Sequence, residues 1–167
     1  MQSTDINAEA LKETVLRILS ENRVMAVATL RPDGWPQATL VGYMYDGLTL
    51  YFAIARDGQK LANMQRDPRI SIAIGRHDGD GPDLRGLSLA AKAVEVTASD
   101  EVRRLNTMLV ARYPEQEVFT PQGASVAVMR ATPLVMSVID PHSGLDRPVL
   151  LRVDPLTSAL LPAEETP

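Results

Sequence analysis

The alternation of hydrophobic and polar positions predicts a helix near the start of the chain, over residues 6–21. Hydrophobic residues recur there at three- and four-residue spacing, which is typical of an amphipathic helix with one buried face. The residues of this face are Leu11, Val15, Ile18 and Leu19. We therefore expect a helix that packs on a core formed by the segments that follow.

The next part of the chain has the pattern of short strands joined by turns. Residues 24–30 are almost entirely hydrophobic, and residues 37–45 and 48–55 follow with many β-branched and aromatic side chains. An Asp-Gly pair lies in each of the two connections, at positions 33–34 and 46–47. Because Asp-Gly pairs favour the tight turns of β-hairpins, this pattern predicts an antiparallel meander.

The second half of the chain continues this pattern around a further helix. We expect strands over residues 69–75, 86–96 and 125–140, the last as one strand or two. Residues 76–86 are predicted to form a polar, glycine-rich loop, and residues 99–114 a helix capped by Ser99. The segment after His142 matches no single element, and we expect it to pack on the core or to contact a partner subunit.

About six strands in sequential antiparallel order, with three inserted helices, predict a mainly β protein. Its sheet would be closed into a barrel or tightly rolled rather than arranged as a parallel α/β fold. A chain of 167 residues is long enough for one domain with a substantial core. We place this single domain at residues 1–145 and treat residues 146–167 as a C-terminal tail.

Composition and charge narrow the classes of function. The formal net charge of −4 argues against nucleic-acid binding, which requires a basic surface. The absence of cysteine excludes disulfides and thiol nucleophiles. The first residues lack the pattern of a signal peptide, and no hydrophobic run is long enough to span a bilayer. We therefore expect a cytoplasmic protein with neither nucleic-acid nor membrane partners.

The chain offers no evident catalytic or metal-binding motif. His77 and His142, the only histidines, lie in polar segments without metal-ligand spacing. The acidic segment 78–83 begins like a calcium-binding loop, but Leu89 stands where that loop requires a bidentate glutamate. If the protein is an enzyme, we expect a cofactor to carry its chemistry.

The stretch ARDGQKLANMQRDP, residues 55–68, predicts a short polar helix between two hydrophobic strands. We expect Asp57 to cap this helix, which places Gln59 and Lys60 in its first turn. Backbone N–H groups at a helix start lack internal partners, and the helix dipole there favours negative charge. A lysine in the first turn destabilises the helix by itself, and a bound phosphate would relieve that cost.

Two neighbours would extend this anion site. Arg56 would add a second positive group, and Asn63, one turn after Gln59, would line the same side of the helix. The alternative is an ordinary solvated basic helix start, in which Lys60 contacts only water.

The order of these segments resembles the FMN-binding split β-barrel family, the pyridoxamine 5'-phosphate oxidase-like proteins. The resemblance runs from residue 24 to about residue 96, through VMAVATLRPDGWPQATLVGYMYDG, LYFAIARDGQKLANMQRDPRISIAIG and RGLSLAAKAVEV. Its motifs are the DG-x-P turn after the first strand and the K-x-x-N-x-x-x-x-P spacing of Lys60, Asn63 and Pro68. It implies a six-stranded antiparallel split β-barrel.

The resemblance also implies a cofactor site. Lys60 and Gln59 would hold the FMN phosphate, with Arg56 beside them. The flavin ring would lie against the second strand, mainly through backbone groups, and the third strand would line the phosphate or ribityl side. These strand residues are Thr39, Leu40 and Val41, and Ala53, Ile54 and Ala55. Gly58 and Gln59 stand where well-known members carry Ser and Arg, so we expect a weaker grip on the phosphate.

The leading prediction is a homodimeric FMN-binding flavoprotein with the flavin at the subunit interface. It would act as a flavin-dependent oxidoreductase on a small molecule, with hydride or electron transfer supplied by the cofactor. One alternative is a deazaflavin-dependent reductase of the same fold, although the acidic segment 78–83 does not suit the longer acidic tail of a deazaflavin. The other is a non-catalytic flavin- or haem-binding stress or storage protein.

Overall fold

The computed structural model describes residues 8–77, 84–115 and 125–163 of the chain. Three α-helices and nine strands lie within these residues. The helices are α1 (Ala8–Glu21), α2 (Gln59–Arg66) and α3 (Ser99–Arg112). The strands are β1 (Val24–Leu30), β2 (Pro36–Gly42), β3 (Met44–Asp46), β4 (Thr49–Ala55), β5 (Arg69–His77), β6 (Leu84–Glu95), β7 (Val126–Asp140), β8 (Leu145–Val153) and β9 (Leu160–Pro162).

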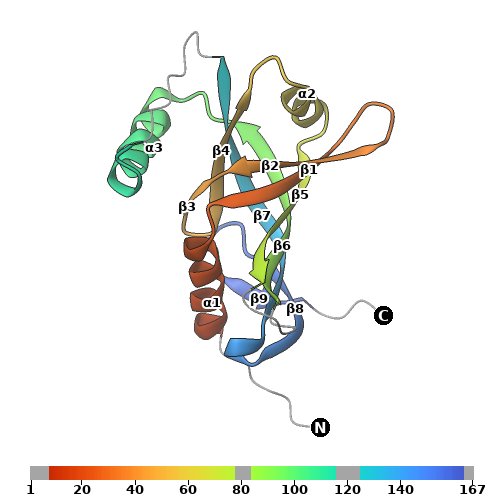
Figure 1. Cartoon of the computed structure of the whole chain (residues 1–167), viewed down its shortest axis with the longest axis vertical. Coiled ribbons are helices and arrows are strands. Elements are labelled where there is room, and N and C mark those ends of the chain that lie inside the picture. Colours follow the sequence, from red (N-terminus) through yellow and green to blue (C-terminus); the bar gives the residue numbers. More distant parts are fainter. Residues whose placement is uncertain (1–7, 78–83, 116–124, 164–167) are drawn as a thin grey trace.

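All strand pairs are antiparallel, and they form one strongly curved sheet. Its main path has the order β2-β1-β5-β6-β7-β4-β3, while β8 pairs with β7 and β9 with β8. The two ends of this path, β2 and β3, are separated in sequence by Tyr43 alone. Because the chain joins the two ends directly, the sheet must roll up on itself, and Figure 1 shows the resulting barrel.

The barrel core follows from strict alternation along the strands. In β5 the buried side chains are Ile70, Ile72 and Ile74, with exposed residues between them. Strand β6 opposes them residue by residue, pairing Ile72 with Leu89 and Ile74 with Leu87. Side chains of a strand point alternately to the two faces of the sheet, so one face of each strand fills the barrel.

The helices cover different parts of this barrel. The predicted hydrophobic face of α1 is buried, which confirms the helical spacing read from the sequence. Figure 1 shows α1 along the lower part of the barrel, α2 at its upper end and α3 set to one side. Leu105 and Leu109 of α3 form a separate small core with Met44 and Tyr51. None of the helices in the described part of the chain is both long and apolar enough to cross a membrane.

The prediction of a single strand over residues 37–45 was wrong. The chain bends at Tyr43, whose backbone N–H donates to the carbonyl of Arg23 at 3.2 Å. Its buried side chain donates through Oη to the carbonyl of Leu19 at 2.9 Å. These two contacts turn Tyr43 toward α1, so that β2 pairs with β1 and β3 pairs with β4.

The strand count exceeds the expected six for two reasons. The bend at Tyr43 divides one expected strand into β2 and β3. The segment after His142, for which no element was predicted, supplies β8 and β9, which extend the sheet from β7. Residues 125–140 form one continuous strand rather than two.

The polar loop predicted over residues 76–86 is shorter than expected. Strand β5 continues to His77 and β6 begins at Leu84, where these two residues pair with each other. The acidic segment 78–83 lies outside the described residues.

Both predicted helix caps were wrong by one residue. Gly58, not Asp57, is the N-cap of α2, because the Gly58 N–H donates to the carbonyl of Ala55 and places Asp57 within a tight turn. Ala98, not Ser99, is the N-cap of α3, since its carbonyl accepts the first helical hydrogen bond, from Val102. Neither helix has a side-chain cap.

Candidate functional site

The side chain of Asn63 anchors α2 to the barrel. It is 1% exposed, and its Nδ2 donates to Thr29 Oγ1 at 2.9 Å and to Gln37 Oε1 at 3.2 Å. Its Oδ1 accepts a hydrogen bond from Gln59 Nε2 at 2.8 Å, so Gln59 and Asn63 share one side of the helix as predicted. This network fixes the start of α2 against β1 and β2, since buried amides are costly unless they are satisfied.

Lys60 lies in the first turn of α2, where its charge is disfavoured for two reasons. Partial burial lowers the pKa of its ammonium group through loss of solvation. The positive end of the helix dipole acts in the same direction. Within the described residues, no hydrogen bond or salt bridge to the Lys60 side chain compensates these effects. An anion placed here would relieve both costs.

Arg56, immediately before this helix, is already engaged. Its Nη2 lies 2.8 Å from Glu95 Oε1 and 3.4 Å from the carbonyl of Val126. The carboxylate therefore balances its charge in this conformation. A contact between Arg56 and a cofactor phosphate stays a prediction, and it would require the guanidinium to share or exchange its partner.

The three predicted residues of β2 do not face the same way. Thr39 and Val41 are half-buried on the barrel side, whereas Leu40 is 74% exposed on the outer side. Thr39 Oγ1 is buried, and no hydrogen-bond partner for it lies in the described part of the chain. A planar ligand against one side of β2 would thus contact all three residues only through the backbone, as the family resemblance implies.

The three predicted residues of β4 are divided in a similar way. Ile54 is 4% exposed and belongs to the barrel core. Ala55 is exposed, and its carbonyl accepts from the Gly58 N–H. Ala53 lines a cavity of about 260 Å³ between the barrel and α3. The structure thus brings the end of β4 to the start of α2, as the predicted site requires.

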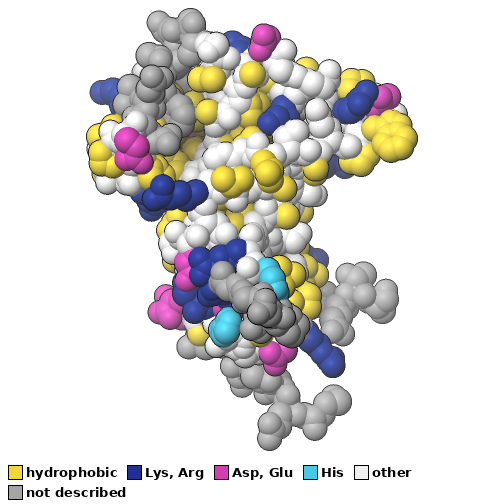
Figure 2. All heavy atoms as spheres, viewed as in Figure 1, with side chains coloured by type: hydrophobic (Ala, Val, Ile, Leu, Met, Phe, Trp, Pro, Cys, Tyr) yellow, Lys and Arg dark blue, Asp and Glu magenta, His cyan; other side chains and the backbone are white. Residues whose placement is uncertain are grey.

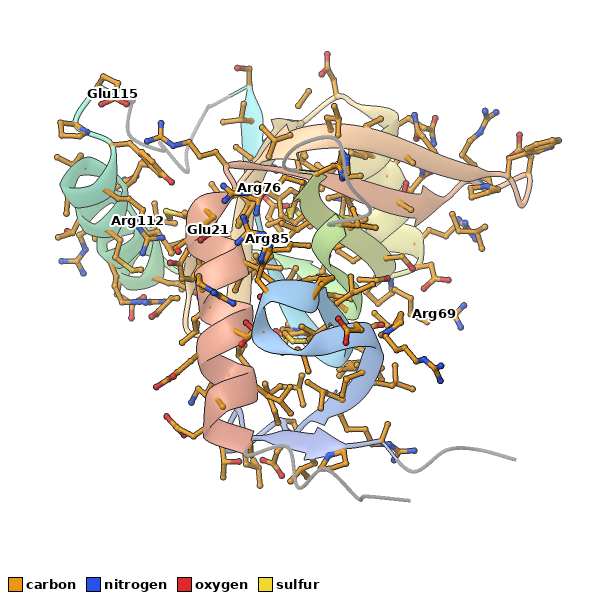
Figure 3. The ribbon with its side chains drawn as sticks, turned by 60° about the horizontal axis from the view of Figure 1, so that its bottom comes forward. Glu21, Arg69, Arg76, Arg85, Arg112 and Glu115 are labelled. Atoms are coloured by element: carbon orange, nitrogen blue, oxygen red, sulfur yellow. The ribbon has the colours of Figure 1, made fainter. Side chains whose placement is uncertain are left out.

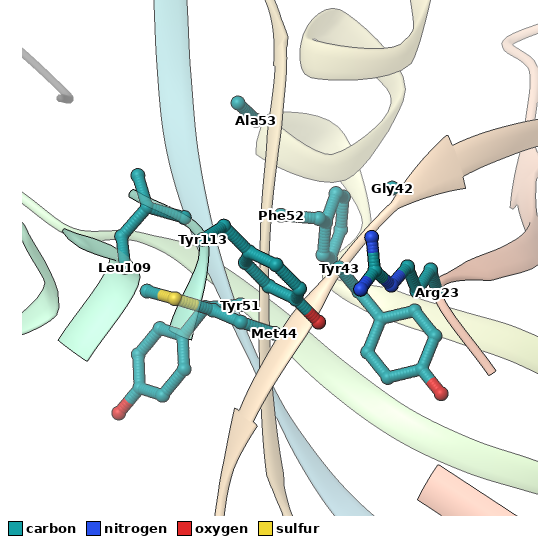
Figure 4. A pocket seen from close by; sticks show the side chains of 9 residues that line it. All are labelled: Arg23, Gly42, Tyr43, Met44, Tyr51, Phe52, Ala53, Leu109 and Tyr113. Carbon is teal, nitrogen blue, oxygen red and sulfur yellow. The ribbon is translucent and has the colours of Figure 1, made fainter. Parts of the chain in front are cut away.

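The cavity beside Ala53 contains residues that the sequence patterns did not single out. Arg23 from the α1–β1 connection and Tyr113 from the end of α3 meet there, with Cζ of Arg23 4.8 Å from the centre of the Tyr113 ring (Figure 4). These residues lie far apart in the sequence and belong to no motif, so only the tertiary structure reveals the contact.

A larger, open hollow of about 780 Å³ lies on the outer face of the sheet. Its lining is mainly apolar and includes Leu40 and Leu84. Glu21 stands at its rim, where its Oε2 lies 3.2 Å from Arg76 Nη2 and 3.3 Å from Arg85 Nη1. Figure 3 shows these three side chains close together near the end of α1.

Comparison with known proteins identifies the family of this chain. A family profile described as pyridoxamine 5'-phosphate oxidase matches residues 11–139, which is most of the chain. The chain belongs to this family. Membership confirms the resemblance read from the sequence and agrees with the observed antiparallel barrel.

One curated relative is general stress protein 26 of Bacillus subtilis. The two proteins are 27% identical over 88 residues, which are 53% of this chain and 61% of that protein. The match therefore spans less than two thirds of the relative's length.

Solved structures support the same fold. A putative pyridoxamine 5'-phosphate oxidase from Listeria innocua superposes with a TM-score of 0.62 at 23% identity, covering 77% of this chain and 97% of that one. A haem-binding protein from Mycobacterium smegmatis gives a TM-score of 0.65 at 18% identity, covering 84% of this chain and 57% of that one. At these identities the likeness concerns the fold alone.

The described residues contain no group of three or more acidic, histidine or cysteine side chains suited to hold a metal ion.

Proposed function

We propose that this protein binds FMN, with the phosphate at the start of α2 and the flavin ring along β2. The observation that carries the proposal is the first turn of α2, where Lys60 is partly desolvated and has no anionic partner among the described residues. A phosphate there would receive charge-assisted contacts from the ammonium group and from free backbone N–H groups.

The residues of the chain fit such a group at a second point. The hydroxyl of Thr39 is buried without a hydrogen-bond partner in the described residues, and buried hydroxyls normally have one. A polar edge of a flavin ring beside β2 would satisfy it. Gln59 and Asn63 would then hold the helix start in place through their mutual hydrogen bond.

FMN supplies hydride or electron transfer when bound, and the protein supplies its position and surroundings. Lys60 would hold the phosphate and so fix the distance of the ring from the helix. Backbone groups of Thr39, Leu40 and Val41 would orient the ring along the strand. We therefore propose a flavin-dependent oxidoreductase that acts on a small molecule.

We further propose that two copies of the chain complete the site. Leu40, Leu84 and Val24 are 74%, 51% and 51% exposed, and they line the same outer hollow. Contiguous exposed apolar surface of this kind favours a protein partner. Hydrophobic side chains are also frequent over the upper part of the surface in Figure 2. A second copy on this face would cover the outer side of β2, the strand along which the flavin is proposed to lie.

Titration of the purified protein with FMN, followed by quenching of flavin fluorescence, tests the cofactor. Lys60→Ala is expected to weaken FMN binding by about tenfold or more, because a charge-assisted contact to the phosphate is lost. Riboflavin, which has no phosphate, should lose less than about twofold in affinity. Lys92→Ala, which removes an exposed lysine from β6, is the matched control. Equal losses for FMN and riboflavin would refute the phosphate contact.

The same titration separates the other cofactors. Binding of a deazaflavin but not FMN would overturn the proposal in favour of a deazaflavin-dependent protein. Binding of haem, seen as a shifted haem absorption band, with no FMN binding at micromolar concentrations would favour a haem-binding protein. Turnover with a nicotinamide donor would then distinguish an enzyme from a flavin carrier.

Analytical ultracentrifugation tests the assembly. Leu40→Arg places a charge in the outer hollow and is expected to give a monomer with weakened FMN binding. Leu156→Arg is the matched control, because Leu156 is 92% exposed in the connection between β8 and β9. A monomeric unmodified protein that still binds FMN would exclude the shared site.

A further inference from the structure

The cavity between α3 and the strands β2 to β4 contains an arginine that has no carboxylate partner among the described residues. Arg23 enters it from the α1–β1 connection and is exposed to solvent. In the described residues, no carboxylate lies within salt-bridge distance of its guanidinium, which only stacks on the ring of Tyr113. A delocalised, weakly hydrated cation on an aromatic face is well suited to bind a carboxylate through two parallel hydrogen bonds.

Of the three tyrosines in this cavity, Tyr113 alone has a hydroxyl not engaged by other described residues. Tyr43 donates to the carbonyl of Leu19, and Tyr51 contacts Glu101 and Arg104. Figure 4 shows the hydroxyl of Tyr113 and the guanidinium of Arg23 projecting into the same space. Among the described residues, the cavity therefore presents the cation of Arg23 and the unengaged hydroxyl of Tyr113 side by side.

The remaining walls are aromatic and apolar. Besides the polar pair, the lining residues include the aromatic Tyr43 and Phe52 and the apolar Met44 and Leu109. Aromatic walls favour a planar ring in stacked or edge-to-face contact. A volume of about 260 Å³ suits one ring with a small substituent, since an apolar cavity of about 150 Å³ holds benzene.

We propose that this cavity binds a small aromatic carboxylate, with the carboxylate on Arg23 and Tyr113 and the ring against the aromatic and apolar lining of the cavity. Ala53 lines the cavity and also belongs to the strand predicted to border the flavin, and Gly42 follows the flavin-facing residues of β2. The bound acid would thus lie beside the cofactor. Its use as a redox substrate rests on the proposed function, whereas its binding does not.

Calorimetric titration with benzoate tests this site, once without FMN and once with saturating FMN. Benzoate is expected to bind at least about tenfold more tightly than benzamide, which has the same shape without the charge. It is also expected to bind more tightly than cyclohexanecarboxylate, which has the charge without the aromatic ring. Equal affinity for benzoate and either analogue would overturn the corresponding part of the proposal.

Substitutions assign the contacts. Arg23→Gln is expected to weaken benzoate binding by about tenfold or more, and Tyr113→Phe is expected to weaken it by a few fold. The matched control is Arg112→Gln, because Arg112 stacks on Tyr45 at 4.3 Å but does not line this cavity. Thermal unfolding confirms that each variant is folded. Unchanged benzoate affinity in a folded Arg23→Gln variant would refute the site.

The two proposals fail in different ways. If benzoate binds and its binding depends on Arg23, but FMN does not bind, the aromatic-acid site is supported and the proposed flavin function is refuted. If FMN binds but benzoate does not bind at concentrations up to about 10 mM, the aromatic-acid site is refuted, because specific small-ligand sites bind more tightly than this. The proposed flavin function would be unaffected.

Discussion

The side-chain amide of Asn63 in α2 donates a hydrogen bond to the hydroxyl of Thr29 in β1, over 2.9 Å and 34 positions of sequence. Both residues are buried, and Gln37 and Gln59 complete the network. The position of the α2 helix start, and hence of Lys60, therefore depends on a polar contact inside the barrel wall.

This contact predicts a large effect of Asn63→Ala. The substitution leaves buried polar groups without partners, and we expect it to lower the free energy of unfolding by about 2–3 kcal/mol. Urea denaturation of Asn63→Ala, Thr29→Val and the double variant measures it. We expect a coupling energy of about 1 kcal/mol between the two positions, and strictly additive effects would contradict the network.

Lys60 predicts a pH dependence of stability. Because burial lowers its pKa from 10.5 in the folded state only, the unfolded chain binds more protons in the range between the two values. Stability from this group therefore rises as the pH increases through that range. Compared with Lys60→Met, the unmodified protein should become relatively more stable in urea denaturation as the pH rises toward 10.5. Lys92→Met should not reproduce this difference, and parallel pH profiles for Lys60→Met and the unmodified protein would contradict it.

Thr39→Val should have opposite effects on folding and on cofactor binding. Val has nearly the shape of Thr but lacks the hydroxyl, which is buried without a hydrogen-bond partner among the described residues, so we expect the flavin-free protein to gain about 1 kcal/mol. FMN should bind more weakly, since the ring loses a hydrogen-bond partner. Urea denaturation and fluorescence titration measure the two effects. A destabilised flavin-free variant would show that the hydroxyl is satisfied in the folded protein.

The ion pair between Arg17 and Asp140 should be among the most sensitive contacts of the fold. The carboxylate of Asp140 is fully buried and also accepts from Ser143 Oγ at 2.9 Å. Arg17→Met leaves a buried charge without its counterion and is expected to cost about 3 kcal/mol in the free energy of unfolding. Adding Asp140→Asn should restore part of the loss. A cost below about 1 kcal/mol, the usual value of an exposed pair, would contradict this role.

The facing glycines Gly75 and Gly86 allow β5 and β6 to approach closely. A Cβ at Gly75 would lie 2.7 Å from the carbonyl oxygen of Arg85 and 3.1 Å from Gly86 Cα, both backbone atoms. Gly75→Ala must therefore displace a strand, and we expect a loss of about 2 kcal/mol. Gly42→Ala is the control, because its nearest contact is 3.8 Å. Similar thermal unfolding midpoints for the two variants would contradict the steric argument.

Local sequence patterns were sufficient to predict most of the helices and strands. The three- and four-residue spacing placed α1, and the two Asp-Gly turns placed the first hairpins, because both signals depend on neighbouring residues. The bend at Tyr43 was missed because it depends on contacts with Leu19 and Arg23, which no local pattern records. Strands β8 and β9 were missed for a related reason: β8 is held by pairing with β7, and β9 by pairing with β8, rather than by a periodicity of their own.

The same distinction between local patterns and long-range contacts applies to the candidate site. The helix that carries Lys60, the strand that carries Thr39 and the family of the chain could be predicted from the sequence, because short ordered motifs encode them. The hydrogen bond of Asn63 to Thr29, the ion pair of Arg56 with Glu95 and the contact of Arg23 with Tyr113 could be found only in the folded chain. These contacts join residues far apart in the chain, and their geometry is fixed by how the sheet closes.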